Sequence, residues 1–335
     1  MVGRTQRRQA LILLTHSDAA RELYYGARAL AELQALGDVR LNETGAPLAG
    51  ESLVAAARGV RIIVADRAIP APAELFAALP DLVAFCRGAV DIRTVDVAAA
   101  TAAGVLVTRA SPGFVPAVCE LIVGLAIDLC RGVTASVVSY RAGAQPPVRM
   151  GRQIAGSAVG IIGHGAIGRE LARLMQALGA TVIIADPYAK DVETVPLATL
   201  LAQSDIVVCL AVANAETANL MDAAAFAAMR PGALFINASR GELVDEAALA
   251  DALDRGHLAG AALDVGRAPD QMPSSGLAQR PDVLATPHIG GLTRPAADHQ
   301  ALETVRQVAA ILAGTVPDGA VNATPGSPLS SLRGA

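Results

Sequence analysis

The chain contains no tryptophan, and its few phenylalanine and tyrosine residues bring the aromatic share to only 3%. It also lacks an excess of one charge, because 27 basic and 31 acidic residues leave a formal net charge of −4. This balance gives no general attraction to nucleic acid or to an acidic membrane surface. The composition therefore favours a protein that acts on small molecules, without a nucleic-acid partner.

Paired cysteine motifs and long hydrophobic runs are lacking as well. The four cysteines have neither disulfide-framework nor metal-site spacing, and no secretory signal is recognised, so a reduced, cytoplasmic compartment and no metal are expected. The apolar stretch from Val115 to Cys130 contains two acidic residues and is shorter than the roughly 20 residues needed to span a bilayer. It is interpreted as a buried helix or a subunit interface, with no membrane association.

What the chain does have is length for about two domains and a 53% hydrophobic content dominated by small aliphatic residues. Apolar strands at residues 10–14, 61–65 and 82–86 alternate with helical stretches, which predicts an α/β unit with a parallel sheet up to about residue 110. His16, Tyr24 and Tyr25 are interpreted as packing or surface residues of this unit. A single long helix is predicted from Pro116 towards Tyr140, and the helical segment 296–313 is expected to cross back to the first unit.

The most informative stretch runs from Val159 to Gly168, where an apolar strand ends in three closely spaced glycines and continues as a helix. Gly163 permits a tight turn, Gly165 lets the backbone approach a pyrophosphate, and Gly168 lets the helix pack on the strand. The N-terminus of the helix then faces the phosphate charge. This pattern predicts a dinucleotide-binding loop rather than an ordinary strand-to-helix turn.

A second apolar strand, residues 181–185, follows that helix and ends at Asp186. This carboxylate lies 18 positions after Gly168, close to the offset of roughly 20 residues expected for an acid that binds the adenosine ribose. No arginine follows Asp186 to receive a 2′-phosphate. NAD is therefore the predicted cofactor, in preference to NADP.

Further strands at residues 205–210, 233–237, 260–265 and 283–286 predict a doubly wound sheet. Ligands of such sheets bind at the carboxyl ends of the strands, where Arg240 and His288 are both expected. A guanidinium there can hold a carboxylate and polarise a carbonyl group, and an imidazole can exchange a proton with the carbonyl oxygen. The structural alternatives are a capping or surface arginine and a buried structural histidine.

The first unit offers a second ligand-binding candidate where its strand at 82–86 ends. Backbone N–H groups of Gly88, Ala89 and Val90 at this edge are predicted to bind a substrate carboxylate. Arg87 and Arg93 flank them. Either arginine is interpreted as a contact for an anionic substrate or as a solvated surface charge.

In this order and spacing, the glycine loop with Asp186, the stretch 237–249 and the stretch 286–291 resemble the NAD-dependent D-2-hydroxyacid dehydrogenases. Phosphoglycerate, glyoxylate/hydroxypyruvate and D-lactate dehydrogenases belong to this superfamily, and formate dehydrogenase does more distantly. The resemblance extends from about Leu82 to Gly314. It implies two Rossmann-like doubly wound domains with a cleft between them: a discontinuous substrate-binding domain, residues 1–110 plus 293–335, and an NAD-binding domain, residues 111–292.

The resemblance also implies residue roles and a homodimer joined through the NAD-binding domains. Arg240 would bind the substrate carboxylate and carbonyl, His288 would be the acid/base, and Asp264 would hold the nicotinamide amide. The predicted substrate contacts are Arg87, Gly88, Ala89 and Val90. The predicted coenzyme contacts are Gly163, His164, Gly165, Ala166, Ile167, Gly168, Asp186, Thr217, Ala238, Ser239, Asp264 and Gly290.

The sequence departs from the family pattern around the histidine. The family places a glutamate after the strand that matches residues 263–265, where it orients the histidine, but no glutamate occurs here between Glu246 and Glu303. Asp270 is a candidate substitute, and Gln271 is another that would orient the ring without a charge. Elsewhere Leu210, Val212 and the pair Arg93-Thr94 replace residues frequent in the family, which indicates a divergent subfamily.

The main hypothesis is an NAD-dependent enzyme that moves a hydride between the nicotinamide and C2 of a small 2-hydroxy or 2-oxo acid. A competing hypothesis is an NAD-sensing binding protein, similar to corepressors that use this fold. The third is an oxidase of a small anion such as formate or phosphite.

Overall fold

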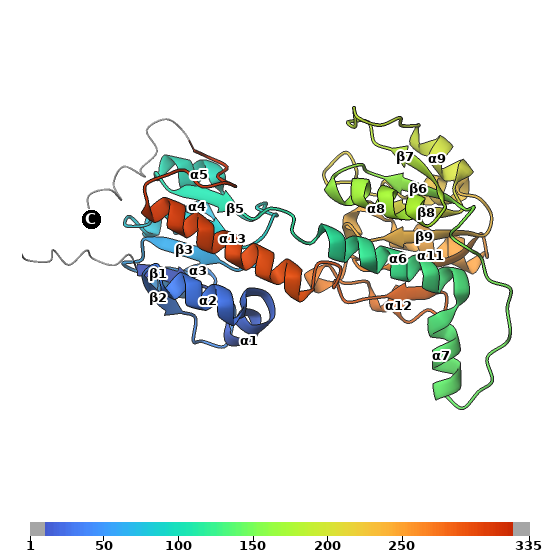
Figure 1. Ribbon diagram of the computed structural model, residues 1–335, viewed down its shortest axis with the longest axis horizontal. Coiled ribbons are helices and arrows are strands. Elements are labelled where there is room, and N and C mark those ends of the chain that lie inside the picture. The colour runs from blue at the N-terminus through green and yellow to red at the C-terminus, as the bar shows by residue number, and fades with distance from the viewer. Residues whose placement is uncertain (1–10, 324–335) are drawn as a thin grey trace, which may run out of the picture. The chain divides into compact units, whose positions relative to one another are not determined.

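The computed structural model describes residues 11–323, which divide into two compact units. The first unit runs up to Gly113 and resumes at Arg294, and the second comprises Phe114–Thr293. Each unit contains one parallel β-sheet with helices on both faces (Figure 1). The predicted fold class, an α/β protein with two doubly wound parallel sheets, is confirmed.

The sheet of the first unit has five strands in the order β2-β1-β3-β4-β5, and all neighbours are parallel. The sequence predicted the three inner strands but neither edge strand, because half of the residues in β2 and in β5 are polar or charged. The predicted strand 82–86 is displaced, since Leu82 lies in a turn and the strand extends to Arg87. The bounds are β1 Leu11–Leu14, β2 Asp38–Leu41, β3 Ile62–Ala65, β4 Ala84–Arg87 and β5 Leu106–Arg109.

Alternate side chains of these strands build two separate hydrophobic layers. On one face Ile12, Leu14 and Val64 pack against α2 and α13, and on the other Leu13, Ile63 and Phe85 pack against α3, α4 and α5. The last long helix, α13, thus returns to the first sheet (Figure 1). The bounds are α1 Asp18–Ala20, a π-helical turn Arg21–Tyr25, α2 Gly26–Gln34, α3 Gly50–Ala57, α4 Ala73–Ala78, α5 Val97–Ala102 and α13 Arg294–Leu312.

The sheet of the second unit has six strands in the order β11-β10-β9-β8-β6-β7, and all neighbours are parallel. Because every strand runs in the same direction, all six carboxyl ends lie at one edge of this sheet. The strand order reverses beside β6, which is where open α/β sheets bind ligands. The bounds are β6 Ala158–Ile162, β7 Thr181–Ala185, β8 Ile206–Cys209, β9 Ala233–Asn237, β10 Leu258–Leu263 and β11 Val283–Ala285.

Two groups of helices cover the faces of this sheet. Buried residues of α6 and α8, such as Ile122 and Leu171, pack on one face, and those of α9 to α12, such as Phe226 and Leu249, pack on the other. Two short 3-10 turns, Gly241–Leu243 and Pro269–Gln271, lie in the loops. The helix bounds are α6 Val115–Arg131, α7 Val133–Arg141, α8 Ala166–Ala177, α9 Leu197–Gln203, α10 Ala223–Ala228, α11 Glu246–Asp254 and α12 Ser275–Ala278.

The prediction of one long helix from Pro116 towards Tyr140 is wrong, because Gly132 divides it into α6 and α7. Gly132 has a φ of 62° and ends α6 in the left-handed conformation that glycine adopts readily. The carboxylate of Asp128 then accepts the backbone N–H of Thr134 at 2.8 Å and so starts α7. Among the described residues no single helix is long and apolar enough to cross a membrane, although this pair, bent by 68°, reaches that length and composition together.

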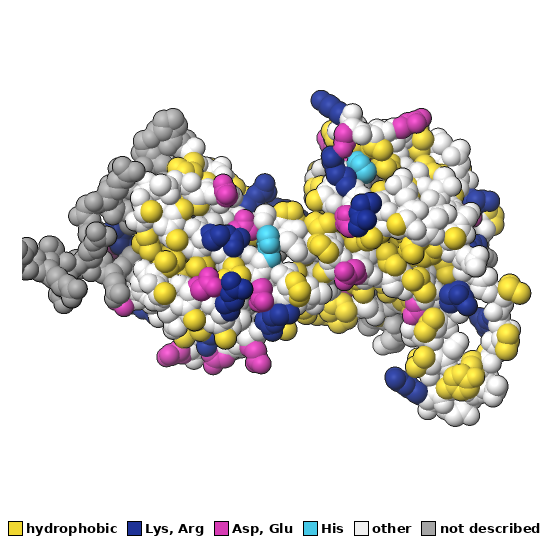
Figure 2. All heavy atoms as spheres, in the orientation of Figure 1, with side chains coloured by type: hydrophobic (Ala, Val, Ile, Leu, Met, Phe, Trp, Pro, Cys, Tyr) yellow, Lys and Arg dark blue, Asp and Glu magenta, His cyan; other side chains and the backbone are white. Residues whose placement is uncertain are grey.

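The four cysteines, at positions 86, 119, 130 and 209, are buried free thiols. Burial raises the pKa of Cys86 and of Cys209 to about 12. Within residues 11–323 no group of three histidine, cysteine or acidic side chains is arranged to hold a metal ion. On the drawn face, acidic and basic side chains are interspersed without a continuous patch of one sign (Figure 2).

Candidate active site

The glycine loop joins β6 to α8 and is shaped by close backbone contacts. Gly163 has a φ of 99°, and a Cβ there would lie 2.7 Å from the carbonyl oxygen of Leu210. A Cβ on Gly168 would lie 2.2 Å from the carbonyl oxygen of Gly163. At Gly165, by contrast, a Cβ would meet nothing within 4 Å. The turn is therefore tightly packed at Gly163 and Gly168 but open at Gly165, beside the N-terminus of α8, where a pyrophosphate would approach.

A second feature of this loop fits a bound dinucleotide. His164 is buried, and its Nδ1 has no hydrogen-bond partner among the described residues. A buried polar atom of this kind is costly unless something else completes the site. The open cradle and this unsatisfied nitrogen together fit a loop that is completed by a ligand.

Asp186 follows β7 and is held by the backbone around it. Its Oδ2 accepts the N–H of His164 at 2.7 Å, and its Oδ1 accepts the N–H of Tyr188 at 2.8 Å. Burial alone would raise the pKa of the Asp186 carboxyl, but backbone N–H donors from His164, Tyr188 and Ala189 outweigh it and lower the pKa. The group is thus a carboxylate at neutral pH, the form that accepts hydrogen bonds from ribose hydroxyls.

Arg240 lies in the loop after β9, which the buried side chain of Asn237 holds. The Asn237 amide donates from Nδ2 to the carbonyl oxygen of Arg240 at 2.9 Å and accepts the N–H of Ser239 at 3.1 Å. The Ser239 hydroxyl donates to the carbonyl oxygen of Ala211 at 2.7 Å, which ties this loop to the one after β8. Arg240 itself is partly exposed.

Gly241 brings the Arg240 loop against the loop after β10, and Gly266 lets that second loop fold closely on itself. A Cβ on Gly241 would lie 2.1 Å from the carbonyl oxygen of Gly266, and a Cβ on Gly266 would lie 2.5 Å from Cα of Pro273. Neither contact leaves room for a side chain. The backbones of the two loops therefore pack directly on each other at Gly241 and Gly266, and this contact fixes the backbone position of the neighbouring Arg240.

Asp264 holds the loop that carries His288. Its Oδ1 accepts the hydroxyl of Thr286 at 2.6 Å and the N–H of Ile289 at 2.8 Å, and its Oδ2 accepts the N–H of Gly290 at 2.8 Å. His288 between them has a φ of 53°, a conformation that a non-glycine residue adopts only when its surroundings impose it. Asp264 supplies that constraint. One lone pair of its carboxylate remains, so its predicted contact with a nicotinamide amide stays a prediction.

The loop after β10 contains the residues proposed from the sequence to replace the glutamate. It closes on itself through the N–H of Gly266, which donates to the carbonyl oxygen of Gln271 at 2.8 Å. The Arg267 guanidinium is directed to the carbonyl oxygens of Val244 and Glu242. The side chain of Asp270 lies outside the described residues, so a role for it or for Gln271 beside His288 stays a prediction.

Thr217, another predicted coenzyme contact, is part of the loop after β8. Its hydroxyl donates to the carbonyl oxygen of Val212 at 2.6 Å and accepts the N–H of Asn214 at 2.9 Å. These bonds shape the loop at the carboxyl edge. Contact of Thr217, Ala238 or Ala166 with a coenzyme stays a prediction.

In the first unit, the backbone donors predicted to bind a carboxylate are only partly available. The N–H of Gly88 already donates to the carbonyl oxygen of Ala65 at 2.9 Å, which corrects the prediction for this residue. Within the described part of the chain no acceptor is recorded for the N–H groups of Ala89 and Val90. These two remain candidates for a substrate contact.

Arg87 is the last residue of β4, and its side chain is fully buried. Its guanidinium donates to the carbonyl oxygens of Asp66 and Ile69, at 2.5 and 2.6 Å, and to the hydroxyl of Thr94 at 2.9 Å. The interpretation as a solvated surface charge is therefore wrong. A direct substrate contact does not fit these internal bonds either, so Arg87 shapes the loop that follows it. Arg93 is exposed and pairs with Asp91 at 2.8 Å.

His16 and Tyr25 are buried packing residues, as predicted, and Tyr24 is half-buried. The His16 ring lies 5.1 Å from the Tyr25 ring, centre to centre, and its Nε2 is 3.6 Å from the Asp66 carboxylate. Burial lowers the pKa of His16 to about 4, although Asp66 opposes the shift. The ring is thus neutral at physiological pH. It lies close to Gly88, since a Cβ on this glycine would be 3.9 Å from Cε1 of His16.

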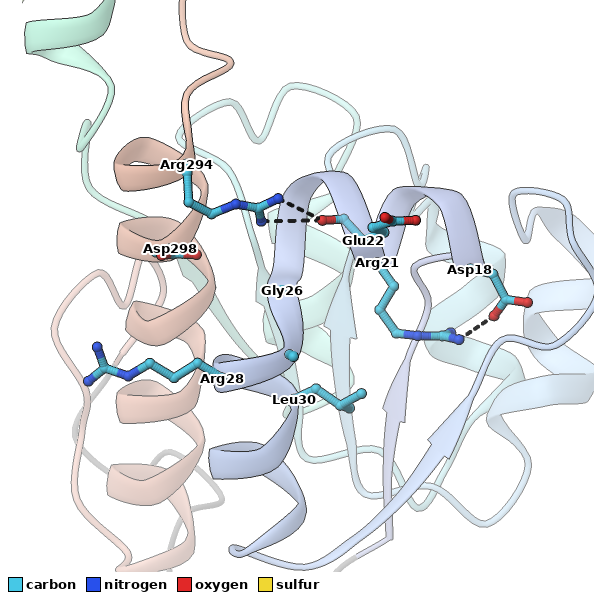
Figure 3. A pocket seen from close by; sticks show the side chains of 9 residues that line it. Asp18, Arg21, Glu22, Gly26, Arg28, Leu30, Arg294 and Asp298 are labelled. Atoms are coloured by element: carbon cyan, nitrogen blue, oxygen red, sulfur yellow. Dashed lines mark hydrogen bonds and ion pairs between the residues drawn. The ribbon is translucent and has the colours of Figure 1, made fainter.

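A cavity of about 530 Å³ opens elsewhere in the first unit, around the π-helical turn and the start of α13 (Figure 3). Arg294 donates to the carbonyl oxygen of Glu22, and Arg21 pairs with Asp18 (Figure 3). None of the predicted catalytic, coenzyme or substrate residues lines this cavity. Three arginines and three acidic residues line the cavity, so its charge favours neither an anionic nor a cationic ligand.

The residues that hold the site in place were not predicted in that role. Asn237 was noted only as the start of the Arg240 stretch, and Asp264 only as a contact for the nicotinamide. Each is a polar residue that ends or follows an apolar, buried strand. That position is the available signal, because a buried polar side chain there must find backbone partners in the adjoining loops.

Comparison with known proteins agrees with this arrangement. Residues 123–290 match the model of the D-isomer specific 2-hydroxyacid dehydrogenase, NAD binding domain. A D-3-phosphoglycerate dehydrogenase from Mycobacterium tuberculosis is 36% identical over 280 residues, 81% of this chain and 53% of the relative. An (S)-sulfolactate dehydrogenase from Chromohalobacter salexigens is 36% identical over 265 residues, 76% of this chain and 86% of the relative. The chain spans about half the length of the mycobacterial relative.

A solved structure shares the fold over nearly the whole chain. The TT0316 protein from Thermus thermophilus superposes with a TM-score of 0.84 and 28% identity, covering 93% of this chain and 99% of the other. Together with the family match, these similarities show that the chain belongs to the D-isomer specific 2-hydroxyacid dehydrogenase family. The resemblance noted from the sequence is thereby confirmed at the level of the family.

Proposed function

We propose that the protein is an NAD-dependent dehydrogenase that interconverts a small 2-hydroxy acid and its 2-oxo acid. The observation that carries the proposal is the arrangement of the second unit, whose six parallel strands bring the glycine loop, Asp186, Arg240 and His288 to one edge. When bound there, the nicotinamide gives or accepts the hydride. The Arg240 guanidinium binds the substrate carboxylate and polarises the carbonyl. His288 gives a proton to the carbonyl oxygen, or removes it in the reverse direction.

The two units are assigned different tasks in this proposal. The second unit, with its match to an NAD binding domain, binds the coenzyme, and the first, built from both parts of the chain, is the substrate-binding domain. The N–H groups of Ala89 and Val90 serve as donors to the substrate, positioned by Arg87. NAD is favoured over NADP because the Asp186 carboxylate, held by the N–H groups of His164 and Tyr188, repels a 2′-phosphate.

The names of the two relatives guide the choice of substrates to assay. Phosphoglycerate and sulfolactate are both 2-hydroxy acids with a second anionic group. The proposed substrates are acids of the glyoxylate, hydroxypyruvate and phosphoglycerate type, of which only phosphoglycerate has a second anionic group. A higher kcat/KM for the doubly anionic acids supports a cation such as Arg93 near the second group.

The experiment that tests the reaction compares wild-type protein with His288→Gln and Arg240→Lys. NADH oxidation is measured with a panel of 2-oxo acids, and NADH affinity is measured by fluorescence. We expect His288→Gln to lower kcat by about 10²- to 10⁴-fold, the usual contribution of a general acid, while NADH binding is retained. His257→Gln is the matched control, because His257 bonds the carbonyl oxygen of Met229 at 3.0 Å, away from the carboxyl edge.

A second candidate function is an NAD-sensing binding protein. The observation that favours it is that no glutamate occurs between Glu246 and Glu303, the stretch in which the family pattern places one. NADH binding without turnover across the whole panel supports this reading and rejects the dehydrogenase.

We also propose that two copies of the chain associate through α6 and α7. Hydrophobic side chains are exposed on α7, among them Val138 at 58% and Tyr140 at 62%. A monomer gains nothing from this exposure, whereas an interface would bury it. Light scattering after size-exclusion chromatography tests the proposal: the wild type is expected to be dimeric and Val138→Asp monomeric, with Val316→Asp, exposed at 55% in the other unit, as the control.

A further inference from the structure

A salt bridge next to the predicted ribose-binding carboxylate has no role in the function proposed so far. Arg169 lies in the first turn of α8, directly after Gly168. Its Nε donates to the carbonyl oxygen of His164 at 3.2 Å. Its two terminal nitrogens both bind the carboxylate of Asp191, with Nη2 at 3.2 Å from Oδ1 and Nη1 on Oδ2. The guanidinium is thus held between the glycine loop and the loop after β7.

The salt bridge between Arg169 and Asp191 is linked to Asp186 through a single residue, His164. The carbonyl oxygen of His164 accepts from Arg169, while the N–H of the same residue donates to Oδ2 of Asp186 at 2.7 Å. The sequence showed no arginine directly after Asp186. The fold nevertheless brings one to this region, from the helix that follows the glycine loop.

We propose that Asp191 keeps Arg169 from binding a 2′-phosphate and thereby helps the protein to select NAD over NADP. A guanidinium binds a carboxylate and a phosphate with the same bidentate geometry. The Asp191 carboxylate therefore occupies the position on Arg169 that a 2′-phosphate would take. The inference rests on the proposed function, because it requires a dinucleotide at the glycine loop with its ribose at Asp186.

The charges around the pair set the size of the effect. Arg169 and Asp191 are each about half exposed, at 54% and 48% of the side chain, so solvent and salt weaken their attraction. Neutralising Asp191 would remove one negative charge and release a bidentate phosphate donor. We expect the affinity for NADPH relative to NADH to rise about tenfold, the size of a single charge-assisted contact.

The experiment measures equilibrium binding, so it does not depend on turnover. Dissociation constants for NADH and NADPH are determined by fluorescence for the wild type, Asp191→Asn, Arg169→Gln and the double variant. Asp191→Asn should gain affinity for NADPH and leave that for NADH unchanged, and the gain should shrink at high salt. The double variant should lose the gain, because no guanidinium remains to bind the phosphate.

Two further variants make the assignment specific. Lys190 is exposed and adjacent to Asp191 in the chain, so Lys190→Gln is added to Asp191→Asn, and the NADPH gain should persist. Asp251→Asn is the matched control, because Asp251 on α11 pairs at 2.7 Å with Arg255, the residue that follows this helix, and both side chains are similarly exposed.

An unchanged ratio of NADPH to NADH affinity in Asp191→Asn overturns the inference. So does a gain that survives removal of Arg169. If the wild type binds NADH, either of these results rejects only the role of Asp191 and leaves the proposed dehydrogenase function standing. Absence of NADH binding in the wild type rejects the proposed function itself.

Discussion

The two sheets of this protein hold their carboxyl-edge loops with buried groups of opposite charge. In the first unit the cation Arg87 donates to the carbonyl oxygens of Asp66 and Ile69. In the second the anion Asp264 accepts the N–H groups of Ile289 and Gly290. Each buried charge thus binds one kind of backbone group, carbonyl oxygens in the first unit and N–H groups in the second.

The difference explains why the two units contribute different chemistry to the proposed reaction. In the first unit the buried guanidinium binds carbonyl oxygens of the loop after β3, and the N–H groups of Ala89 and Val90 in the loop after β4 have no acceptor among the described residues, which suits an anion. A buried carboxylate takes up N–H donors, so recognition falls to the side chains of Arg240 and His288. The following variants test each half of this comparison, from the largest expected effect to the smallest.

Replacing the buried cation should have the largest effect. Arg87→Met leaves the carbonyl oxygens of Asp66 and Ile69 without their donors, and each unsatisfied buried group costs about 1–3 kcal/mol. We expect the first unit to lose about 3 kcal/mol of stability. Hydrogen exchange of β3 and β4 should accelerate, while exchange in β9 and β10 of the second unit stays as in the wild type.

Arg93→Met is the matched control for this variant, because Arg93 is exposed and pairs with Asp91 on the surface. Its effect on stability should be below about 1 kcal/mol. Equal exchange rates in Arg87→Met and Arg93→Met would contradict the structural role of Arg87.

Acid should weaken the first unit through His16. The pKa of His16 is about 4 in the folded protein and 6.5 in the unfolded chain, so between these values the unfolded chain binds a proton that the folded protein does not. Stability therefore falls as pH decreases from 7 towards 4, by on the order of 2 kcal/mol at pH 5. Urea unfolding at pH 7 and pH 5 should show this loss in the wild type and a smaller one in His16→Gln. The same loss in both proteins would assign the acid sensitivity to other groups.

Weakening the buried anion should have the smallest effect on stability and show mainly in kcat. Asp264→Asn keeps the size of the side chain but removes one of three acceptor contacts to the loop at 286–290, so we expect kcat to fall about tenfold, which corresponds to about 1.4 kcal/mol. Gly290→Ala is a charge-neutral counterpart, because its Cβ would lie 2.8 Å from Oδ2 of Asp264. Wild-type kcat in both variants would show that the position of His288 does not depend on Asp264.

The sequence predicted those features that depend on local spacing. The position of the glycine loop follows from the spacing of three glycines, and that of Asp186 from the length of the strand before it. The shared edge of Arg240 and His288 follows from the parallel direction of the strands. The buried position of Arg87 was not predictable, because two of its three partners, Asp66 and Ile69, lie about 20 residues earlier in the chain and an arginine at the end of a strand is usually exposed. The bridge from Arg169 to Asp191 likewise depends on the fold.

The break between α6 and α7 at Gly132 was missed for a different reason. The apolar pattern continues from α6 into α7, so hydrophobic periodicity alone favours one helix. The glycine and the side chain of Asp128, which accepts the N–H of Thr134, are the local signals that contradict it. Weighing capping residues against periodicity would have corrected this prediction.

The burial of all four cysteines makes the protein a convenient background for site-directed labelling. Buried thiols with raised pKa values react slowly with maleimides, since the thiolate is the reactive form. A cysteine introduced at fully exposed Val148 or at Val316 should therefore take up a dye or a spin label selectively. Pairs of such labels, one in each unit, would report changes in the separation of the two units when coenzyme is added, without replacement of any native residue in the cores.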